Sequence, residues 1–364
     1  MHTQSSFRLL VVRLGAMGDV LHALPAVTAL RRAHPSWTID WVIEPAWQPL
    51  LTATNSAPAE PLSPAQPLVN RIHLAPAKAW ARRPLSGNTL RQIAGLRRIL
   101  KASAYSAVLD FQGAVRSALI ARATGSARVI GEANPRESAA KWFFSERIGT
   151  VGRHVIEQDI ELAAAVAGDT LPFVPPLLPV DPEAESWCDR LLAPFPRRPL
   201  ALLKPGAGWG AKRWPVERYA AVASALAERG FCVLVNAGPG EEPLAESVAA
   251  QSGGAATAVL CSLAQLIALT QRTALAIGGD TGPIHLACAL GRPVVGIYGP
   301  TDPARNGPYG TRFRVLRSPF SLRNHARRNA PEAGLLTITP EDVLKAVDEV
   351  IAEEGGAMSQ EAAR

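Results

Sequence analysis

The sequence predicts an α/β fold with two Rossmann-like, doubly wound parallel sheets. Short runs rich in β-branched residues and leucine alternate with helix-like stretches, as in βαβ units. The same alternation restarts after a proline-rich stretch at residues 171–182. With 364 residues, 48% of them hydrophobic, the chain is long enough to build two cores.

The order of the expected elements supports this division. In the first half we expect strands at 8–14, 38–44 and 105–110, and helices at 20–32 and 90–101. In the second half we expect strands at 199–203, 231–235, 273–277 and 293–298, and helices at 216–229 and 283–290. A closing helix at 340–353 has room to pack on either half, and we expect that the C-terminal helix and tail can pack back on the first domain. We therefore divide the chain into a domain at 1–175, a domain at 183–340, and a C-terminal helix and tail at 341–364.

The charge and cysteine content of the sequence limit the possible functions of the protein. The chain has 38 Lys and Arg against 31 Asp and Glu, and its net charge of +7 favours an acidic partner such as a phosphorylated substrate, nucleic acid or an anionic membrane. Its four cysteines are scattered without a C-x-x-C pair, so we expect neither disulfides nor a thiolate metal site. Because the sequence has no apolar run of about 20 residues, we expect a cytoplasmic protein.

The first chemical signal is the loop Gly15–Asp19, between a predicted strand and a predicted helix. Glycines let the backbone approach a ligand there, and the first helical N–H groups face an anion. Asp19 can instead simply cap the helix. Glu44 ends the next strand where a dinucleotide-binding fold places its ribose-binding acid, but the loop lacks G-x-G-x-x-G, which argues against a dehydrogenase.

The second signal is the segment 277–286, which joins a strand end, two glycines, two N-cap candidates and Pro283. It predicts an anion pocket lined by backbone amides. His285 can donate to a phosphate or sugar, or be an ordinary helical histidine. Because Asp280 would repel a diphosphate, we expect it to contact sugar hydroxyls or loop amides instead.

Two further loops follow strands of the second half. The loop 204–215 carries three cations among three glycines, which suits a phosphate, although a solvated basic loop has the same composition. The loop 237–242 ends in Glu241 and Glu242, whose carboxylates can hold sugar hydroxyls or favour a helix N-terminus.

Taken together, these motifs resemble the lipopolysaccharide heptosyltransferases. The resemblance runs in order from about residue 8 to residue 310 and rests on the segments 17–26, 110–113, 212–215, 279–286 and 298–303. The segment 17–22 resembles the type I enzymes more than type II. The resemblance implies a GT-B fold, with an acceptor-binding domain at 1–175 and a nucleotide-sugar-binding domain at 183–340 that face each other across a cleft.

The resemblance also implies a reaction and a set of site residues. It implies inverting transfer of heptose from ADP-heptose to the Kdo sugar of the lipid A inner core, without a metal or another cofactor. Asp19 matches the catalytic carboxylate, and Lys212 matches the lysine that stabilises the departing diphosphate. The implied donor-binding residues are Ala207, Gly208, Lys212, Glu241, Cys261, Asp280, Thr281, Gly282 and His285. The implied acceptor-binding residues are Gly18, Arg82 and Arg136.

The sequence departs from the family's pattern in two places, where the donor and the acceptor would bind. Ala207 and Gly208 stand where the family has hydroxyl side chains, so backbone amides would bind the diphosphate, and Gln158 stands where it has a basic acceptor contact. The alternatives are a type II enzyme or another transferase of the family, a nucleotide-sugar epimerase and a silent nucleotide-sugar binder. A lipid acceptor allows peripheral contact with the inner membrane through 80–83 and 91–101, and we expect no nucleic-acid partner.

Overall fold

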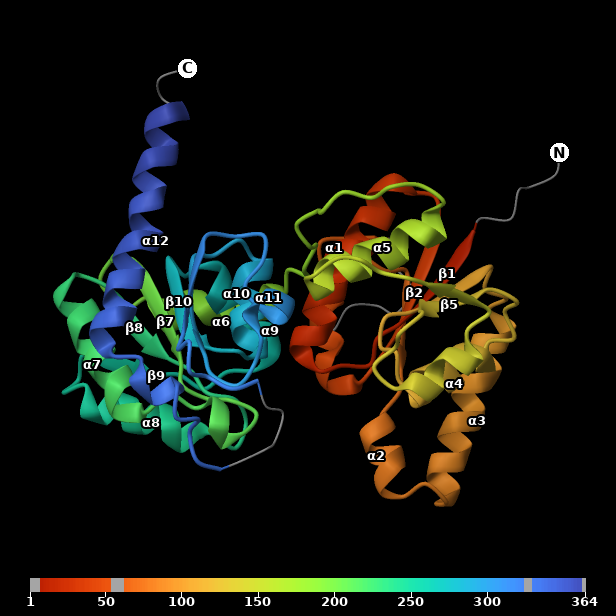
Figure 1. The fold of residues 1–364 in the computed structure, drawn as a ribbon, viewed down its shortest axis with the longest axis horizontal. Helices are drawn as coiled ribbons and strands as arrows, with labels where there is room; N and C mark the ends of the chain where they lie inside the picture. The colour runs from red at the N-terminus through yellow and green to blue at the C-terminus, as the bar shows by residue number, and fades with distance from the viewer. Residues whose placement is uncertain (1–6, 54–61, 324–328, 362–364) are drawn as a thin grey trace. The chain divides into compact units, whose positions relative to one another are not determined.

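The computed structural model describes residues 7–53, 62–323 and 329–361 (Figure 1). Residues 1–6, 54–61, 324–328 and 362–364, which fall within the three predicted parts of the chain, lie outside the described residues. The chain forms two compact units, residues 1–181 and 182–364. Among the described residues, none of the helices has both the length and the apolar character needed to cross a bilayer.

The first unit is built on a six-stranded parallel sheet. Its strands are β1 (Arg8–Val12), β2 (Thr38–Ile43), β3 (Arg71–Leu74), β4 (Ala107–Asp110), β5 (Val129–Glu132) and β6 (Glu146–Ile148). They are arranged as β3-β2-β1-β4-β5-β6, which is the strand order of the dinucleotide-binding fold. The order reverses between β1 and β4, so the loops after these two strands flank the switch point where such sheets bind ligands.

Five helices flank this sheet: α1 (Met17–Ala33), α2 (Ala77–Arg82), α3 (Gly87–Ala102), α4 (Val115–Ala123) and α5 (Val155–Ala167). α1 is buried over most of its length, because its alanines and leucines pack against the sheet and α5. Short 3-10 helices lie at η1 (Pro45–Leu50) and η2 (Ser138–Phe143). α3 differs from α1, since only Thr89 and Leu100 on it are buried.

The second unit repeats the arrangement. Its strands are β7 (Leu200–Lys204), β8 (Cys232–Val235), β9 (Ala256–Ala258), β10 (Leu275–Gly279), β11 (Val294–Tyr298) and β12 (Phe313–Arg317). All pair in parallel in the order β12-β11-β10-β7-β8-β9. Its switch point therefore lies between β7 and β10.

The helices of the second unit enclose that sheet. They are α6 (Pro182–Leu192), α7 (Val216–Glu228), α8 (Glu242–Gln251), α9 (Leu263–Gln271), α10 (Gly282–Ala289), α11 (Pro303–Asn306) and α12 (Pro340–Glu361), with 3-10 turns η3 (Gly210–Lys212) and η4 (Leu335–Thr337). The expectation that the C-terminal helix packs back on the first domain is wrong for the described part of the helix. The structure packs α12 against α7, β11 and β12, with Val343, Val347 and Val350 in the core of the second unit.

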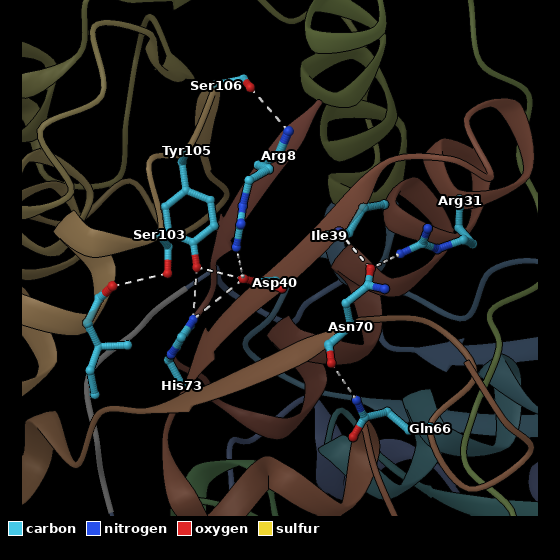
Figure 2. A network of polar contacts seen from close by, with 11 residues as sticks. Arg8, Arg31, Ile39, Asp40, Gln66, Asn70, His73, Ser103, Tyr105 and Ser106 are labelled. Carbon is cyan, nitrogen blue, oxygen red and sulfur yellow. Dashed lines mark hydrogen bonds and ion pairs between the residues drawn. The ribbon is translucent and has the colours of Figure 1, made fainter. Parts of the chain in front are cut away.

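A buried polar network ties the strands of the first sheet together (Figure 2). Asp40 on β2 is fully buried, and the hydroxyl of Tyr105 donates to its Oδ2 at 2.7 Å. The same hydroxyl lies 2.9 Å from Nε2 of His73, and the guanidinium of Arg8 approaches the carboxylate at 4.0 Å. Burial, followed by the charge of Asp40, raises the pKa of Tyr105. Arg8 begins β1 and Tyr105 precedes β4, so the network lies toward the amino ends of the strands, at the opposite edge from the switch point.

Candidate functional site

Asp19 lies at the switch point of the first sheet, in the first turn of α1. Its Oδ2 accepts a hydrogen bond from the backbone N–H of Ala16 at 3.0 Å, so it caps the helix. Its Oδ1 lies 3.3 Å from Nη2 of Arg13, and its side chain is 37% exposed. The capping role is therefore present in the structure, and the carboxylate is still accessible to a ligand.

Arg13 joins the loop after β1 to the turn after β4. Its side chain is buried, and it donates to the backbone oxygens of Asp19 and Phe111. Gln112 strengthens the junction by accepting the N–H of Leu14 at 2.8 Å. Arg13 was not among the predicted site residues, although a cation at the end of an apolar strand and beside a glycine loop is a signal that the sequence shows.

A buried carboxylate holds the turn after β4. Oδ1 of Asp110 accepts hydrogen bonds from the N–H groups of Gln112 and Gly113 and from the hydroxyl of Ser117, at 2.7, 3.0 and 3.1 Å. Its Oδ2 has no hydrogen-bond partner among the described residues. Burial raises the pKa of Asp110 to about 6, and the three hydrogen bonds and the charge of Arg13 oppose that rise.

The predicted acceptor residues lie after three different strands. Gly18 precedes Asp19 in α1, and Arg82 ends α2 with an exposed side chain. Arg136 is also exposed, and its backbone packs against Gly113, where an added Cβ would lie 3.1 Å from the Arg136 nitrogen. The structure thus connects Arg136 to the turn beside Asp19. Gln158, the other departure at this end, donates to the backbone oxygen of Gly152 at 2.8 Å.

Glu44, which dinucleotide-binding folds would use for ribose, has a local role here. Its side chain is buried, and its Oε1 accepts the backbone N–H of Lys78 near the start of α2 at 2.8 Å. This bond satisfies one of the N–H groups that a helix leaves free at its first turn.

In the second unit, Lys212 and Asp280 face each other across the switch point. Nζ of Lys212 lies 2.5 Å from Oδ2 of Asp280, and His285 lies 3.1 Å from Oδ1. The ammonium group also lies 4.4 Å from the ring centroid of Trp209. Burial alone would raise the pKa of Asp280, but its contacts with His285 and Lys212 outweigh burial and lower it.

Asp280 has protein partners besides the sugar hydroxyls or loop amides that the sequence predicts for it. Its side chain is only 9% exposed, and the ammonium group of Lys212 balances its charge. The pairing reduces the repulsion that a free carboxylate would exert on a diphosphate, and the contact to a sugar hydroxyl stays a prediction. His285 is accordingly a buried partner of Asp280 and not a solvated histidine.

Thr281 and Gly282 form the start of α10. Thr281 is its N-cap and Gly282 its first residue, and the Thr281 hydroxyl donates to the oxygen of Gly279 at 3.3 Å. Pro283 follows in the first turn, where a missing N–H costs no hydrogen bond. The first N–H groups of α10 therefore lie beside the Lys212–Asp280 pair and suit an anion.

Glu241 organises the loop after β7. Its Oε1 accepts from Arg213 at 2.7 Å and from the backbone N–H of Ala207 at 3.2 Å. Gly206 makes room for this arrangement, since a Cβ there would lie 2.2 Å from Oε2 of Glu241. Ala207 is buried by the contact, whereas Gly208 is exposed.

The three cations of the loop 204–215 have different environments, which does not fit the alternative of a solvated basic loop. Lys204 is only 3% exposed, and its ammonium donates to Oδ1 of Asn236. Asn236 in turn donates to the oxygen of Val259 at 2.7 Å and to Sγ of Cys261 at 3.3 Å. Burial lowers the pKa of Lys204 to about 8.

The predicted donor residues thus follow β7, β8, β9 and β10, which are neighbours in the sheet, and gather at one edge of the second unit. Asn236 was missed by the sequence analysis, and only its position after a strand end could have indicated it. In the described part of the chain, no group of three or more His, Cys, Asp or Glu side chains is arranged to hold a metal ion.

Two Rossmann-like units in one chain, each with polar residues at its switch point, define the GT-B class of glycosyltransferases. The solved structure of Escherichia coli heptosyltransferase WaaC with ADP-2-deoxy-2-fluoro heptose is 26% identical and aligns with a TM-score of 0.74, covering 94% of this chain and 99% of WaaC. The fold class is therefore confirmed.

Sequence comparison identifies the family. Residues 93–335 match Glycosyltransferase family 9 (heptosyltransferase). Lipopolysaccharide heptosyltransferase 1 of Pseudomonas aeruginosa is 30% identical over 325 residues, which are 86% of this chain and 84% of that protein. The Escherichia coli K12 enzyme of the same name is 31% identical over 318 residues, which are 86% of this chain and 94% of that protein. The chain belongs to glycosyltransferase family 9, the heptosyltransferase family, and the resemblance found in the sequence is confirmed.

Proposed function

We propose that this glycosyltransferase takes ADP-heptose as its donor and transfers the heptose to the Kdo sugar of the lipopolysaccharide inner core, as a type I enzyme. The similarity to lipopolysaccharide heptosyltransferase 1 over most of both chains supports this choice over type II. The relative solved with an ADP-heptose analogue supports the choice of donor.

The donor diphosphate would bind where cations and helix N–H groups meet. Lys212 and the first turn of α10 offer positive charge from β7 and β10, the two strands of the switch point. Thr281 and Gly282 would present their backbone N–H groups to phosphate oxygens, while Asp280 and His285 hold the Lys212 ammonium in place. Ala207 and Gly208 would contribute backbone groups only.

Glu241 and Cys261 would contact the nucleoside. The Glu241 carboxylate is held by Arg213 and the Ala207 N–H, with Oε2 left to accept a ribose hydroxyl. Cys261 lies at the next strand end, joined to Lys204 through Asn236. This placement gives the buried Lys204 an indirect role, in which it positions the wall of the nucleoside site.

The reaction would be a single displacement with inversion. The acceptor hydroxyl oxygen attacks the anomeric carbon of heptose while the bond from that carbon to the diphosphate oxygen breaks, and ADP leaves with the electron pair. Asp19 takes the proton from the hydroxyl. Lys212 and the α10 N–H groups stabilise the charge that develops on ADP. Gly18, Arg82 and Arg136 would bind the acidic acceptor.

One observation carries the proposal: the Lys212–Asp280–His285 cluster stands beside the first turn of α10 at the switch point. The experiment is calorimetric titration of the protein, without added metal, with ADP-heptose, UDP-glucose and NAD. We expect tight binding of ADP-heptose alone, followed by transfer to a Kdo-containing acceptor. Preference for UDP-glucose or NAD would overturn the donor assignment.

The alternatives give different products. An epimerase would convert the donor without any acceptor, a silent binding protein would leave both substrates unchanged, and a type II enzyme would require an acceptor that already carries heptose. Product analysis by mass spectrometry with each acceptor separates these cases. Because the proposed acceptor is a lipid, we also propose a peripheral contact with the cytoplasmic face of the inner membrane.

A further inference from the structure

The positive charge of this chain is concentrated in one segment. Residues 61–109 contain eight Lys and Arg residues and no Asp or Glu, against a net charge of +7 for the whole chain. Seven of the eight lie on α2, on α3 or on the turn between them, at residues 77–102, which we call the basic hairpin. All seven side chains are exposed, and within the described part of the chain none of them forms an ion pair.

The basic hairpin also exposes large apolar side chains. Leu85, in the turn, is 87% exposed, and Leu90 and Ile93, near the start of α3, are 52% and 41% exposed. Figure 1 shows α2 and α3 projecting from the rest of the first unit and joined at their far ends. The bond between the Trp80 indole and Gln92, at 2.8 Å, holds the two helices together. Three of the four exposed large apolar side chains of the basic hairpin therefore lie at or near the turn that joins the helices, and the fourth, Ile99, lies near the other end of α3 and is 50% exposed.

The helical spacing adds cations to the same side of α3. Leu90, Ile93, Arg97 and Lys101 are three or four residues apart, so they form one stripe along the helix. The stripe begins with apolar side chains near the turn and ends with cations. Arg82, Arg83 and Arg91 add charge close to Leu85 and Leu90.

We propose that the basic hairpin is the surface with which this protein docks on an anionic lipid bilayer, with Leu85, Leu90 and Ile93 entering the interface and the surrounding cations facing the phosphate headgroups. Exposed leucines gain free energy on leaving water for the acyl boundary, and each nearby cation gains from the negative surface potential. The biological purpose of this docking rests on the proposed lipid acceptor. The surface itself is defined by the charge and the exposure of the side chains of the basic hairpin.

The composition favours a bilayer over a nucleic acid. Proteins that bind single strands place aromatic side chains among their cations so that bases stack on them. The exposed apolar residues of the basic hairpin are aliphatic, and its tryptophan, Trp80, is half-buried against the core of the first unit. Exposed aliphatic side chains surrounded by cations suit a bilayer, because the apolar side chains can enter the hydrocarbon while the cations face the phosphate headgroups.

The test is sedimentation of the full-length protein with vesicles, without donor or acceptor. One set of vesicles is pure phosphatidylcholine, and the other contains about one third phosphatidylglycerol, a content chosen to give a strong negative surface potential. We expect binding to the anionic vesicles only, and weaker binding as salt is raised. Equal binding to both sets, or no binding to either, would overturn the proposal.

Two tandem arginine pairs provide a matched comparison. Arg97 and Arg98 lie on α3, whereas Arg197 and Arg198 lie before β7 in the second unit, and all four are exposed. We expect the double variant Arg97→Gln/Arg98→Gln to bind anionic vesicles roughly tenfold more weakly. The double variant Arg197→Gln/Arg198→Gln removes the same charge and should bind as the parent does. Equal loss in both variants would mean that net charge, and not the basic hairpin, drives binding.

A second pair of variants tests the apolar tip. Leu85→Ser/Leu90→Ser should also weaken binding by roughly tenfold, through lost burial of two leucines. Phe320→Ser/Leu322→Ser is the control, because those side chains are 81% and 75% exposed on the second unit. If the Leu85 and Leu90 variant binds as tightly as the parent, the tip does not enter the interface and the proposal fails.

Activity then separates docking from acceptor recognition. The Arg97 and Arg98 variant should lose activity on acceptor embedded in anionic vesicles and keep it on a soluble acceptor without acyl chains. Loss on both acceptors would assign the basic hairpin to the acceptor site and overturn the docking role. If even the parent protein transfers to neither acceptor, the proposed function fails, while the vesicle binding still decides the docking surface.

Discussion

Lys212 and Asp280 are 68 residues apart in the sequence, yet their side chains meet at 2.5 Å because β7 and β10 are neighbours in the sheet. The pair positions a cation at the switch point before any ligand arrives. His285 contacts the other oxygen of Asp280, with 3.1 Å between its Nε2 and Oδ1. The proposed donor diphosphate would meet an oriented ammonium group here, so little side-chain entropy would be lost on binding.

Replacing Lys212 should weaken donor binding and turnover together. We expect Lys212→Met to lower kcat by a factor on the order of 100, because it removes a preorganised cation from the leaving group. It should also lower the free energy of unfolding by about 3 kcal/mol, since Asp280 stays buried with one partner fewer. Steady-state kinetics and denaturant unfolding measure the two effects.

The double variant Lys212→Met/Asp280→Asn distinguishes chemistry from folding. Removing the buried charge as well should restore most of the stability without restoring turnover. If turnover returns with stability, Lys212 serves only the fold.

Asp19 can be tested with two substitutions that differ in capping. Asp19→Asn keeps an oxygen that can accept the Ala16 N–H, whereas Asp19→Ala loses it and should cost about 1 kcal/mol of stability. Both should lower turnover by roughly 100- to 10,000-fold with donor affinity changed only a few-fold, because both lack the base. Substantial turnover in the Asn variant would show that capping is the main role of Asp19.

Because of Asp110, the free energy of unfolding should be affected less unfavourably in mild acid than at pH 7. Its pKa of about 6 in the folded state lies above the ordinary aspartate value of 3.8, so the folded state binds the proton more readily. This group therefore costs stability at pH 7, and the cost disappears as the pH falls through 6 toward 4. We expect Asp110→Asn, which keeps an oxygen for the three hydrogen bonds, to flatten the dependence of Tm on pH in that window.

The same substitution should raise the free energy of unfolding at pH 7 by up to about 3 kcal/mol. Asp110→Ala is the contrasting variant, because it leaves two buried N–H groups and a hydroxyl without their acceptor and should be destabilising. An unchanged pH dependence in Asp110→Asn would place the titration elsewhere.

Gly206 and Gly238 allow a test of Glu241 through its neighbours. A Cβ on Gly206 would lie 2.2 Å from Oε2 of Glu241, whereas a Cβ on Gly238 would lie 3.6 Å from the same oxygen, an ordinary contact. We expect Gly206→Ala to displace Glu241 and weaken ADP binding about tenfold, as the loss of one charged hydrogen bond would. Gly238→Ala should bind ADP normally, and equal affinities in the two variants would argue against a role for Glu241.

Much of the fold could be predicted because buried parallel strands appear as continuous apolar runs. The run at 199–203 became β7, shifted by one residue at both ends, and the run at 293–298 became β11, which begins one residue later. The described strands that escaped prediction are β3, β5, β6, β9 and β12. Four of them, β3, β6, β9 and β12, form the edges of the two sheets, and charged residues interrupt the apolar pattern of β3, β6 and β12.

The site was predictable in its location but not in its bonding. Glycine-rich loops after strand ends indicated both switch points before the strand order was known. Which side chains pair with Lys212, Arg213 and Lys204 depends on which strands are neighbours in the sheet. The order of the strands cannot be predicted from the local sequence. The three cations of one loop thus acquired three different environments.

The boundary between Asp181 and Pro182 leaves each sheet complete, with its own core and its own chemistry. The residues proposed for proton transfer are encoded before it and those proposed for the leaving group after it. Recombination at this point would exchange whole halves, so a lineage could acquire a new acceptor while inheriting its activated sugar unchanged. The chain is in this sense modular, and chimaeras joined at this boundary are the natural units in which its specificity could diversify.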